Sequence, residues 1–135
     1  MDLEKSLNIS AAGMRAQGTR LRVISENIAN ANSTAQTPGG EPYRRKLVTF
    51  ENELDRQLGV ETVRVDSIVA DRGAFQRRYE PGHPAADEDG YVLTPNVNSL
   101  MEMADLREAQ RSYEANLKVI ESSRSMLQKT IDILR

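Results

Sequence analysis

Residues 99–135 decide the fold of this chain, and they read SLMEMADLREAQRSYEANLKVIESSRSMLQKTIDILR. No proline or glycine interrupts this stretch, so the sequence predicts one continuous helix. Ser99 followed by Glu102 fits a capping box, in which a hydroxyl and a carboxylate satisfy free amides of the first turn. At about 1.5 Å per residue the helix spans roughly 50–60 Å, more than a compact domain of this size needs. Such a helix projects beyond its own domain, where its apolar stripe needs a partner.

Apolar residues recur at every seventh position near both ends of the chain. Seven-residue spacing keeps one narrow stripe of a helix facing a partner helix. We therefore predict a second long helix at the N-terminus, starting near an N-cap at Asp2, and we expect the two helices to pair as a coiled coil. The residues of the two stripes are Leu7, Met14, Leu21 and Ile28 at the start, and Leu106, Tyr113, Ile120, Leu127 and Leu134 at the end.

Small residues interrupt the N-terminal stripe. Ala11, Gly18 and Ser25 each follow a large apolar residue by four positions, and small side chains let another helix approach closely. Gly13 and Gly18 each cost about 1 kcal/mol in an isolated helix. We therefore expect this helix to be stabilised by its neighbours, and both termini to be largely disordered in the free monomer.

The middle of the chain has a different pattern. Proline and glycine between Ser33 and Pro42 exclude a helix there. Residues 43–50 have strand character, residues 60–65 alternate and extend to 69, and residues 75–79 alternate again after a turn at 71–73. We interpret the last two as a hairpin, and residues 51–58 as ambiguous, with a short helical turn as one option. The chain thus divides into an N-terminal helix (1–33), a loop and hairpin insert (34–95) and a C-terminal helix (96–135). The fold class is mainly α with a small β and loop insert.

Composition excludes several classes of function. The net charge of −2 gives no case for nucleic acid, and without cysteine there is no disulfide or thiolate metal site. No apolar run reaches the roughly 18 residues that span a bilayer. The N-terminus lacks the apolar core of a secretory signal, so the residues alone indicate a cytosolic protein.

The sequence predicts no catalytic, cofactor or metal site. In a calcium-loop register the acidic cluster Asp87-Glu88-Asp89-Gly90 lacks two ligands, so a turn is the better interpretation. His83 lies alone between glycine and proline, without a positioned acid–base partner. The basic clusters at 44–46 and 77–78 are explained by contacts to acidic loops of neighbouring subunits or by solubility.

Residues 7–17 (LNISAAGMRAQ) and 20–34 (RLRVISENIANANST) resemble the N-terminal signature of bacterial flagellar axial proteins of the rod and hook type. Residues 95–106 (PNVNSLMEMADL) and 111–116 (RSYEAN) are similar to the C-terminal helix of that family. The short length and the motifs YEPGHP (79–84) and DEDGYV (87–92) indicate the proximal-rod branch of the flagellar basal-body rod family. One departure is the long spacer at residues 34–42, where many relatives have a short turn.

The resemblance implies a structural subunit of the rod, the drive shaft that carries motor torque across the periplasm to the hook. Residues 1–33 and 96–135 then form the helices of an axial core domain. The implied partners are copies of the same chain, other rod proteins, hook-basal-body adaptor and MS-ring components, and the flagellar type III export apparatus. Export through that apparatus needs no cleaved signal, which moves the expected location to the basal body.

Ten residues are the predicted subunit-packing positions of such a rod protein. Two alternatives remain: a helical adaptor or regulator that binds one partner through the same stripe, and a small hydrolase centred on His83. The packing positions are Leu7, Met14, Leu21, Ile28, Leu106, Tyr113, Leu117, Ile120, Leu127 and Leu134.

Overall fold

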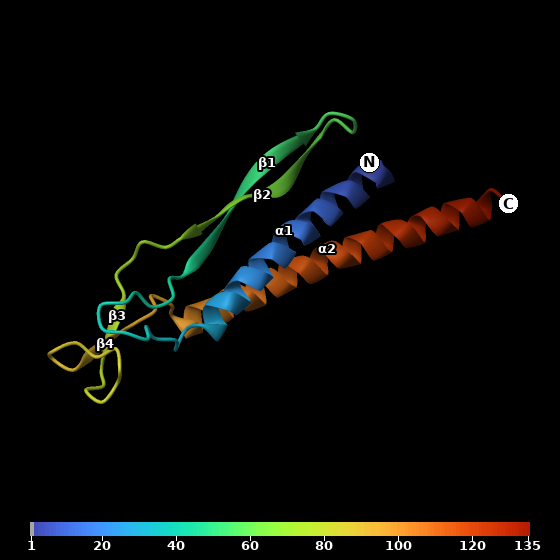
Figure 1. The fold of residues 1–135 in the computed structure, drawn as a ribbon. Helices are drawn as coiled ribbons and strands as arrows, with labels where there is room; N and C mark the ends of the chain where they lie inside the picture. Colours follow the sequence, from blue (N-terminus) through green and yellow to red (C-terminus); the bar gives the residue numbers. More distant parts are fainter. Residues whose placement is uncertain (1) are drawn as a thin grey trace. The chain divides into compact units, whose positions relative to one another are not determined.

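The computed structural model describes residues 2–135, with a long helix at each end and β structure between them (Figure 1). This arrangement confirms the predicted order of helix, β insert and helix. The elements in chain order are α1 (Leu3–Ala29), β1 (Lys46–Asp55), β2 (Val60–Ala70), β3 (Gln76–Tyr79), β4 (Tyr91–Thr94) and α2 (Ser99–Ile133).

The two helices begin at side-chain caps. The Asp2 carboxylate accepts a hydrogen bond from the Glu4 amide at 3.1 Å, as predicted for α1. In α2 the cap is Asn98, whose Oδ1 accepts from the amides of Leu100 (3.1 Å) and Met101 (3.3 Å). The predicted capping box of Ser99 and Glu102 is therefore wrong. An amide side chain one residue earlier takes the capping position, and this leaves Glu102 free to turn inward.

The predicted hairpin of residues 60–69 and 75–79 is wrong, because these two strands belong to two separate two-stranded sheets. β2 pairs with β1, and β3 pairs antiparallel with β4, with Gln76 opposite Thr94 and Tyr79 opposite Tyr91. The ambiguous residues 51–58 are mostly strand, because β1 continues to Asp55. There the Asp55 carboxylate accepts the amides of Gln57 and Leu58 and closes the turn into β2.

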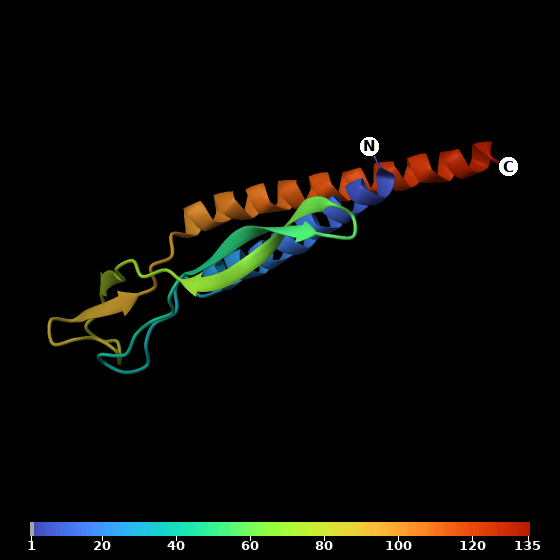
Figure 2. The same ribbon diagram turned by 90° about the horizontal axis from the view of Figure 1, so that it is seen from above.

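The described chain forms two compact units, and each helix contributes to both. Unit 1 contains the residues up to Leu21, Val48–Ser67 and Arg107–Arg135, and unit 2 contains Arg22–Leu47 and Ile68–Leu106. Within unit 1 the two helix segments run antiparallel side by side, and α2 continues past the start of α1 (Figures 1 and 2). The 48–67 part of the β1–β2 hairpin lies along the same stretch of α1.

Each unit has a small core. In unit 1 the buried helix residues are short, namely Ser10, Ala12, Ala16, Ala109 and Ser123. Unit 2 buries aliphatic side chains from α1, β4 and the loop before α2, together with three polar residues: Val23, Ile24, Val92, Val97, Asn27, Thr94 and Glu102. The core of unit 1 is therefore built from small side chains rather than from a large apolar interior.

Candidate assembly surfaces

Small and polar side chains line the contact between the helices in unit 1. A Cβ added to Gly13 would lie 2.8 Å from Nδ2 of Asn116, so only glycine fits at this crossing without displacing a neighbour. Arg20 and Glu108 form an ion pair of 3.5 Å at the edge of the contact. Because the Glu108 side chain is 68% exposed, this pair adds little stability.

The most buried positions of α2 also recur at every seventh residue, but they are not the predicted ones. Glu102, Ala109 and Ser123 are at most 3% exposed, and the half-buried Asn116 completes this series. The predicted residues Leu106, Tyr113 and Ile120 come four positions later, at the edge of the contact. Sequence reasoning missed the series because it followed large apolar residues, whereas α1 approaches α2 along the small ones.

The ten predicted packing residues are only partly covered within the subunit. Of these, Leu117 is 38%, Leu127 44% and Leu134 82% exposed. The others are half-buried: Leu7, Met14, Leu21, Ile28, Leu106, Tyr113 and Ile120.

Exposed apolar residues lie on both sides of the buried series of α2. At about 100° per residue, Leu117 and Ile131 fall on one side, and Val119, Met126 and Ile133 on the other. The apolar side of α2 therefore extends over about half of the helix circumference, more than one partner helix covers. Apolar surface of this extent on a monomer marks an interaction site.

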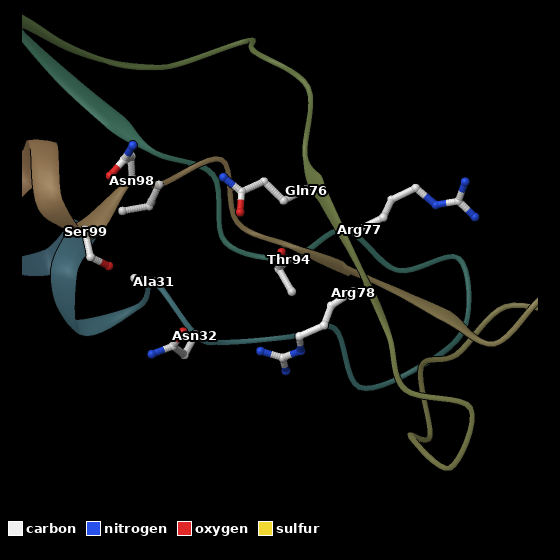
Figure 3. A pocket seen from close by; sticks show the side chains of 9 residues that line it. Ala31, Asn32, Gln76, Arg77, Arg78, Thr94, Asn98 and Ser99 are labelled. Atoms are coloured by element: carbon white, nitrogen blue, oxygen red, sulfur yellow. The ribbon is translucent and has the colours of Figure 1, made fainter.

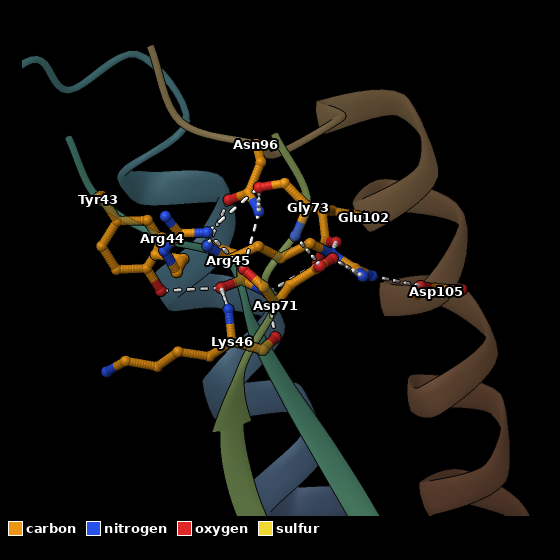
Figure 4. A network of polar contacts seen from close by, with 10 residues as sticks. Tyr43, Arg44, Arg45, Lys46, Asp71, Gly73, Asn96, Glu102 and Asp105 are labelled. Carbon is orange, nitrogen blue, oxygen red and sulfur yellow. Dashed lines mark hydrogen bonds and ion pairs between the residues drawn. The ribbon is translucent and has the colours of Figure 1, made fainter. Parts of the chain in front are cut away.

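In unit 2 a polar cluster joins the two helices to the β insert (Figure 4). Glu102 of α2 is 1% exposed. Its Oε1 accepts from Nε of Arg45, and its Oε2 accepts from Nδ2 of Asn27 at 3.1 Å. Arg45 also pairs with Asp71 at 3.4 Å and with Asp105 at 3.8 Å. The buried carboxylate is thus paired and hydrogen-bonded, as burial of a charge requires.

Asn27 of α1 binds the backbone at the first residue of β1. Its Oδ1 accepts from the Lys46 amide and its Nδ2 donates to the Lys46 carbonyl, both at 2.9 Å. The same Oδ1 accepts from the Tyr43 hydroxyl at 2.8 Å. Asn96 acts similarly, because its Oδ1 accepts from the Arg45 amide at 2.8 Å and its Nδ2 donates to the Asp71 carbonyl at 3.0 Å. The two asparagines therefore hold both ends of the β1–β2 hairpin: Asn27 binds the first residue of β1, and Asn96 binds the residue before β1 and the residue after β2.

The charges of the cluster have defined electrostatic effects. Burial alone lowers the pKa of Arg45, but hydrogen bonds and charges from Glu102 and Asp71 outweigh it and raise the pKa above its ordinary value. Burial also raises the pKa of Tyr43, with smaller contributions from Glu26 and Glu102. Both shifts keep Arg45 positively charged and Tyr43 neutral near neutral pH, so the cluster acts as a structural clamp.

A polar groove of about 480 Å³ lies in unit 2, lined by the chain after α1, by β3 and β4, and by the start of α2 (Figure 3). Its two arginines already have partners in the subunit. Arg77 pairs with Asp87 at 3.2 Å and lies over the Tyr91 ring at 4.5 Å, and Arg78 pairs with Glu80 at 2.9 Å. The groove residues are Ala31, Asn32, Gln76, Arg77, Arg78, Thr94, Val97, Asn98 and Ser99.

His83 and Asp87 have local structural contacts. Nδ1 of His83 accepts from the Ala85 amide at 3.0 Å, and its Nε2 lies 3.1 Å from the Thr34 hydroxyl, which links two loops of unit 2. The Asp87 carboxylate accepts from the amides of Asp89 (3.0 Å) and Tyr91 (2.8 Å), as in a turn. Among residues 2–135 no group of three or more histidine or acidic side chains has the arrangement that holds a metal ion.

Comparison with known proteins first identifies the class of protein to which the chain belongs. A family model described as "Flagellar basal body rod FlgEFG protein C-terminal" matches residues 88–133, which include α2. The chain is 56% identical over 133 residues to the flagellar basal-body rod protein FlgC of Agrobacterium fabrum, covering 98% of this chain and 96% of the relative. It is 41% identical to the FlgC of Borreliella burgdorferi (100% and 99% covered). For the FlgC of Salmonella typhimurium the identity is 38% (98% and 98% covered).

The chain therefore belongs to the FlgC family of flagellar basal-body rod proteins. It is a structural subunit of the basal-body rod and not an enzyme, which confirms the function and location inferred from the resemblance. Within the described residues, no helix combines the length and the apolar character that crossing a membrane requires.

Proposed function

We propose that α1 and α2 pair as a coiled coil within the subunit and pack against the helices of neighbouring subunits, and that this packing builds the rod as a torque-bearing shaft. The observation that carries this proposal is the exposed apolar surface on both sides of the buried series of α2. The buried series of α2 faces α1, and the apolar residues on either side of this series are left to contact neighbouring subunits. A shaft needs contacts that repeat without closing, because only such contacts stack subunits helically.

The partners follow from this arrangement. Copies of this chain and other rod proteins take the helix flanks, while hook-basal-body adaptor and MS-ring components meet the ends of the proximal rod. The chain reaches its site through the flagellar type III export apparatus. The helical segments 1–33 and 96–135 form the wall of the shaft, and residues 34–95 lie outside it and bridge subunits.

The ten packing residues are proposed contacts with neighbouring subunits, with Leu117 and Leu127 as the clearest candidates because both are large and exposed. Burying such side chains between subunits stabilises the assembly by about 1.5–3 kcal/mol each. Leu21 is proposed as the corresponding residue of α1.

Complementation of a strain that lacks this gene tests the proposal. Leu117→Asp and Leu21→Asp should abolish rod assembly and swimming at normal protein levels. Lys118→Asp is the matched control, since Lys118 is exposed on the polar side of the same helix turn and should leave swimming intact. Normal swimming of both leucine variants would overturn the proposed packing surface.

The alternative of a helical adaptor, which would bind a single partner through the same flank of α2, is not retained, because the chain belongs to the FlgC family of rod proteins. The two differ in stoichiometry: an adaptor forms a closed complex of fixed size, whereas a rod subunit adds to an open assembly. Family membership favours the rod subunit.

A further inference from the structure

We propose that the free edge of β3 binds an extended segment of another protein, which adds to the β3–β4 sheet as a third strand and places an acidic side chain in the polar groove of unit 2. This surface belongs to the β insert and is independent of the helix packing proposed above. Two features of unit 2 define it: the backbone groups that β3 leaves unpaired, and the hydrogen-bond donors that line the groove.

The hydrogen bonds at one end of the sheet reveal how β3 and β4 alternate. In an antiparallel sheet, opposed residues alternate between pairs that bond to each other and pairs that do not. The Glu80 amide donates to the Gly90 carbonyl at 2.9 Å, so the pair just beyond β3 is a bonded one. Next to it, Tyr79 lies opposite Tyr91. The Tyr91 amide donates to the Asp87 carboxylate (2.8 Å) and its carbonyl accepts from the Asp87 amide (2.9 Å), so the two tyrosines form a non-bonded pair.

The same alternation leaves backbone groups of Arg77 and Tyr79 at the free edge of β3. Arg77 comes two residues before Tyr79 and lies opposite Leu93, so it is also in a non-bonded pair, whose N–H and C=O groups point away from the partner strand. Within the described residues β3 pairs with β4 alone, and all four residues of β3 are exposed. No hydrogen bond from elsewhere in residues 2–135 reaches the backbone of Arg77 or Tyr79. These two residues therefore offer two donors and two acceptors to an added strand.

An added strand would place every second side chain on the groove side of β3. Gln76 and Arg78 point to that side, toward Asn32, and Arg77 points to the other side (Figure 3). Opposed residues of neighbouring strands share a face of the sheet. A residue opposite Arg78 would therefore enter the groove, whereas residues opposite Arg77 and Tyr79 would stay outside it, beside the Tyr79 ring, which is 63% exposed.

The groove suits a carboxylate better than a basic side chain, since none of the nine residues that line it is acidic. Glu80 approaches Arg78 at Nε, and the two terminal nitrogens of this guanidinium make no hydrogen bond within the described chain. Asn98 uses its Oδ1 to cap α2 and keeps its Nδ2 as a donor. The hydroxyl of Thr94, a residue only 8% exposed, has no hydrogen-bond partner among residues 2–135. A carboxylate would accept from these donors, and its bonds to the guanidinium would be charge-assisted.

The arginines of β3 select a different sequence as the added strand. Two β3 strands paired at their free edges would bring Arg77 and Arg78 of both copies side by side, and opposed like charges destabilise a strand pair. A segment of another protein can carry an acidic residue opposite Arg78 and apolar residues opposite Arg77 and Tyr79. The occupant is therefore an extended segment with one carboxylate between two apolar residues.

NMR titration of the purified full-length chain with a short peptide tests the edge. The probe is acetyl-Thr-Val-Glu-Val-Thr-amide, whose glutamate and valines lie on opposite faces of an extended chain. The amide resonances of Arg77 and Tyr79 should shift on addition of the peptide, and those of Gln76 and Arg78, which bond to β4, should shift less. The same peptide with both valines N-methylated is the matched control, because it keeps the carboxylate and loses the backbone donors.

Three outcomes of the titration would overturn the proposal. Absence of any shift at millimolar peptide would reject the edge as a binding surface. Equal shifts with the N-methylated peptide would reject strand addition. Shifts of Arg77 and Tyr79 that depend on protein concentration without peptide would show that a second copy of this chain covers the edge.

Variants of the two arginines separate the backbone contact from the groove contact. Arg77→Pro removes the free amide without removing a bond to β4, and proline is tolerated at such an edge position, so peptide affinity should fall about fivefold. Arg77→Gln is its control, since it removes the same charge and keeps the amide. Arg78→Gln should weaken binding about threefold, the effect of an exposed ion pair, and this loss should vanish for a peptide with glutamine in place of glutamate. Equal affinities of the two Arg77 variants, or an Arg78→Gln loss that persists with the glutamine peptide, would contradict the proposed contacts.

Discussion

Asn27 of α1 and Glu102 of α2 hydrogen-bond to each other at 3.1 Å, and each side chain is 1% exposed. A buried amide and a buried carboxylate therefore join the helices in unit 2, and Arg45 neutralises the carboxylate. In unit 1 the helices meet where Gly13 lies against Asn116, with the exposed ion pair of Arg20 and Glu108 beside it. The same pair of helices is thus held by two different kinds of contact along its length.

The buried ion pair gives the first prediction. Glu102→Gln removes a charged hydrogen-bond partner of Arg45, which keeps Asp71 and Asp105, so the free energy of unfolding should fall by about 1.5–3 kcal/mol. Urea unfolding measures the change. Glu108→Gln is the matched control on the same helix, and its exposed ion pair should account for less than about 1 kcal/mol. Equal effects of the two substitutions would contradict a clamping role for Glu102.

The helix crossing gives a second prediction through two glycines of α1. A Cβ added to Gly18 would have no neighbouring atom within 4 Å, so Gly18→Ala should stabilise the protein by up to about 1 kcal/mol through helix propensity alone. Gly13→Ala should lack this gain. Its Cβ displaces Asn116, which then loses its 3.0 Å bond to the Ser112 carbonyl. Thermal unfolding of both variants tests the difference, and an equal gain at both positions would exclude a tight crossing at Gly13.

Acidification gives a third prediction, at the turn before β4. The amide of Tyr91, followed by Arg77, holds the pKa of Asp87 below its ordinary value of 3.8. A lowered pKa in the folded state stabilises the turn above that ordinary value, and this stabilisation is lost as the pH falls through the folded value. The amide resonance of Tyr91 should therefore shift only below about pH 4. Asp87→Asn should abolish the shift, and a transition near neutral pH would contradict this assignment.

His83 gives a fourth prediction, which also tests the hydrolase alternative. His83→Ala removes the link to Thr34 and should lower the free energy of unfolding by about 1 kcal/mol. Swimming of the complemented strain should be unchanged, because the histidine joins loops and takes part in no reaction. Loss of swimming with a normally folded protein would return His83 to the candidate functional residues.

The order of elements was predictable, because local signals determine it. The uninterrupted residues 99–135 gave α2, and the dense prolines and glycines after Ser33 ended α1. The hairpin prediction was wrong because residues 60–69 and 75–79 are neighbours in sequence, whereas β2 pairs instead with the earlier β1. Local alternation does not specify which strand is the partner.

The buried helix contact was hidden for a different reason. Heptad spacing draws attention to large apolar residues, and it therefore selected Leu106, Tyr113 and Ile120 rather than the smaller Ala109 and Asn116 beside them. Glu102 was assigned to a capping box because its partner Arg45 is far away in sequence. Only the folded chain brings that arginine to the carboxylate.

The way Asn27 binds Lys46 has a consequence for how this sequence can vary. Both bonds go to the backbone amide and carbonyl of Lys46, which every residue type except proline offers in the same form. The anchor therefore does not depend on the side chain at position 46, whose exposed ion pair with Glu26 at 3.1 Å adds little stability. Asn27, in contrast, has no replacement that supplies a donor and an acceptor in the same space. Related chains should therefore vary in sequence at position 46 and keep asparagine at position 27.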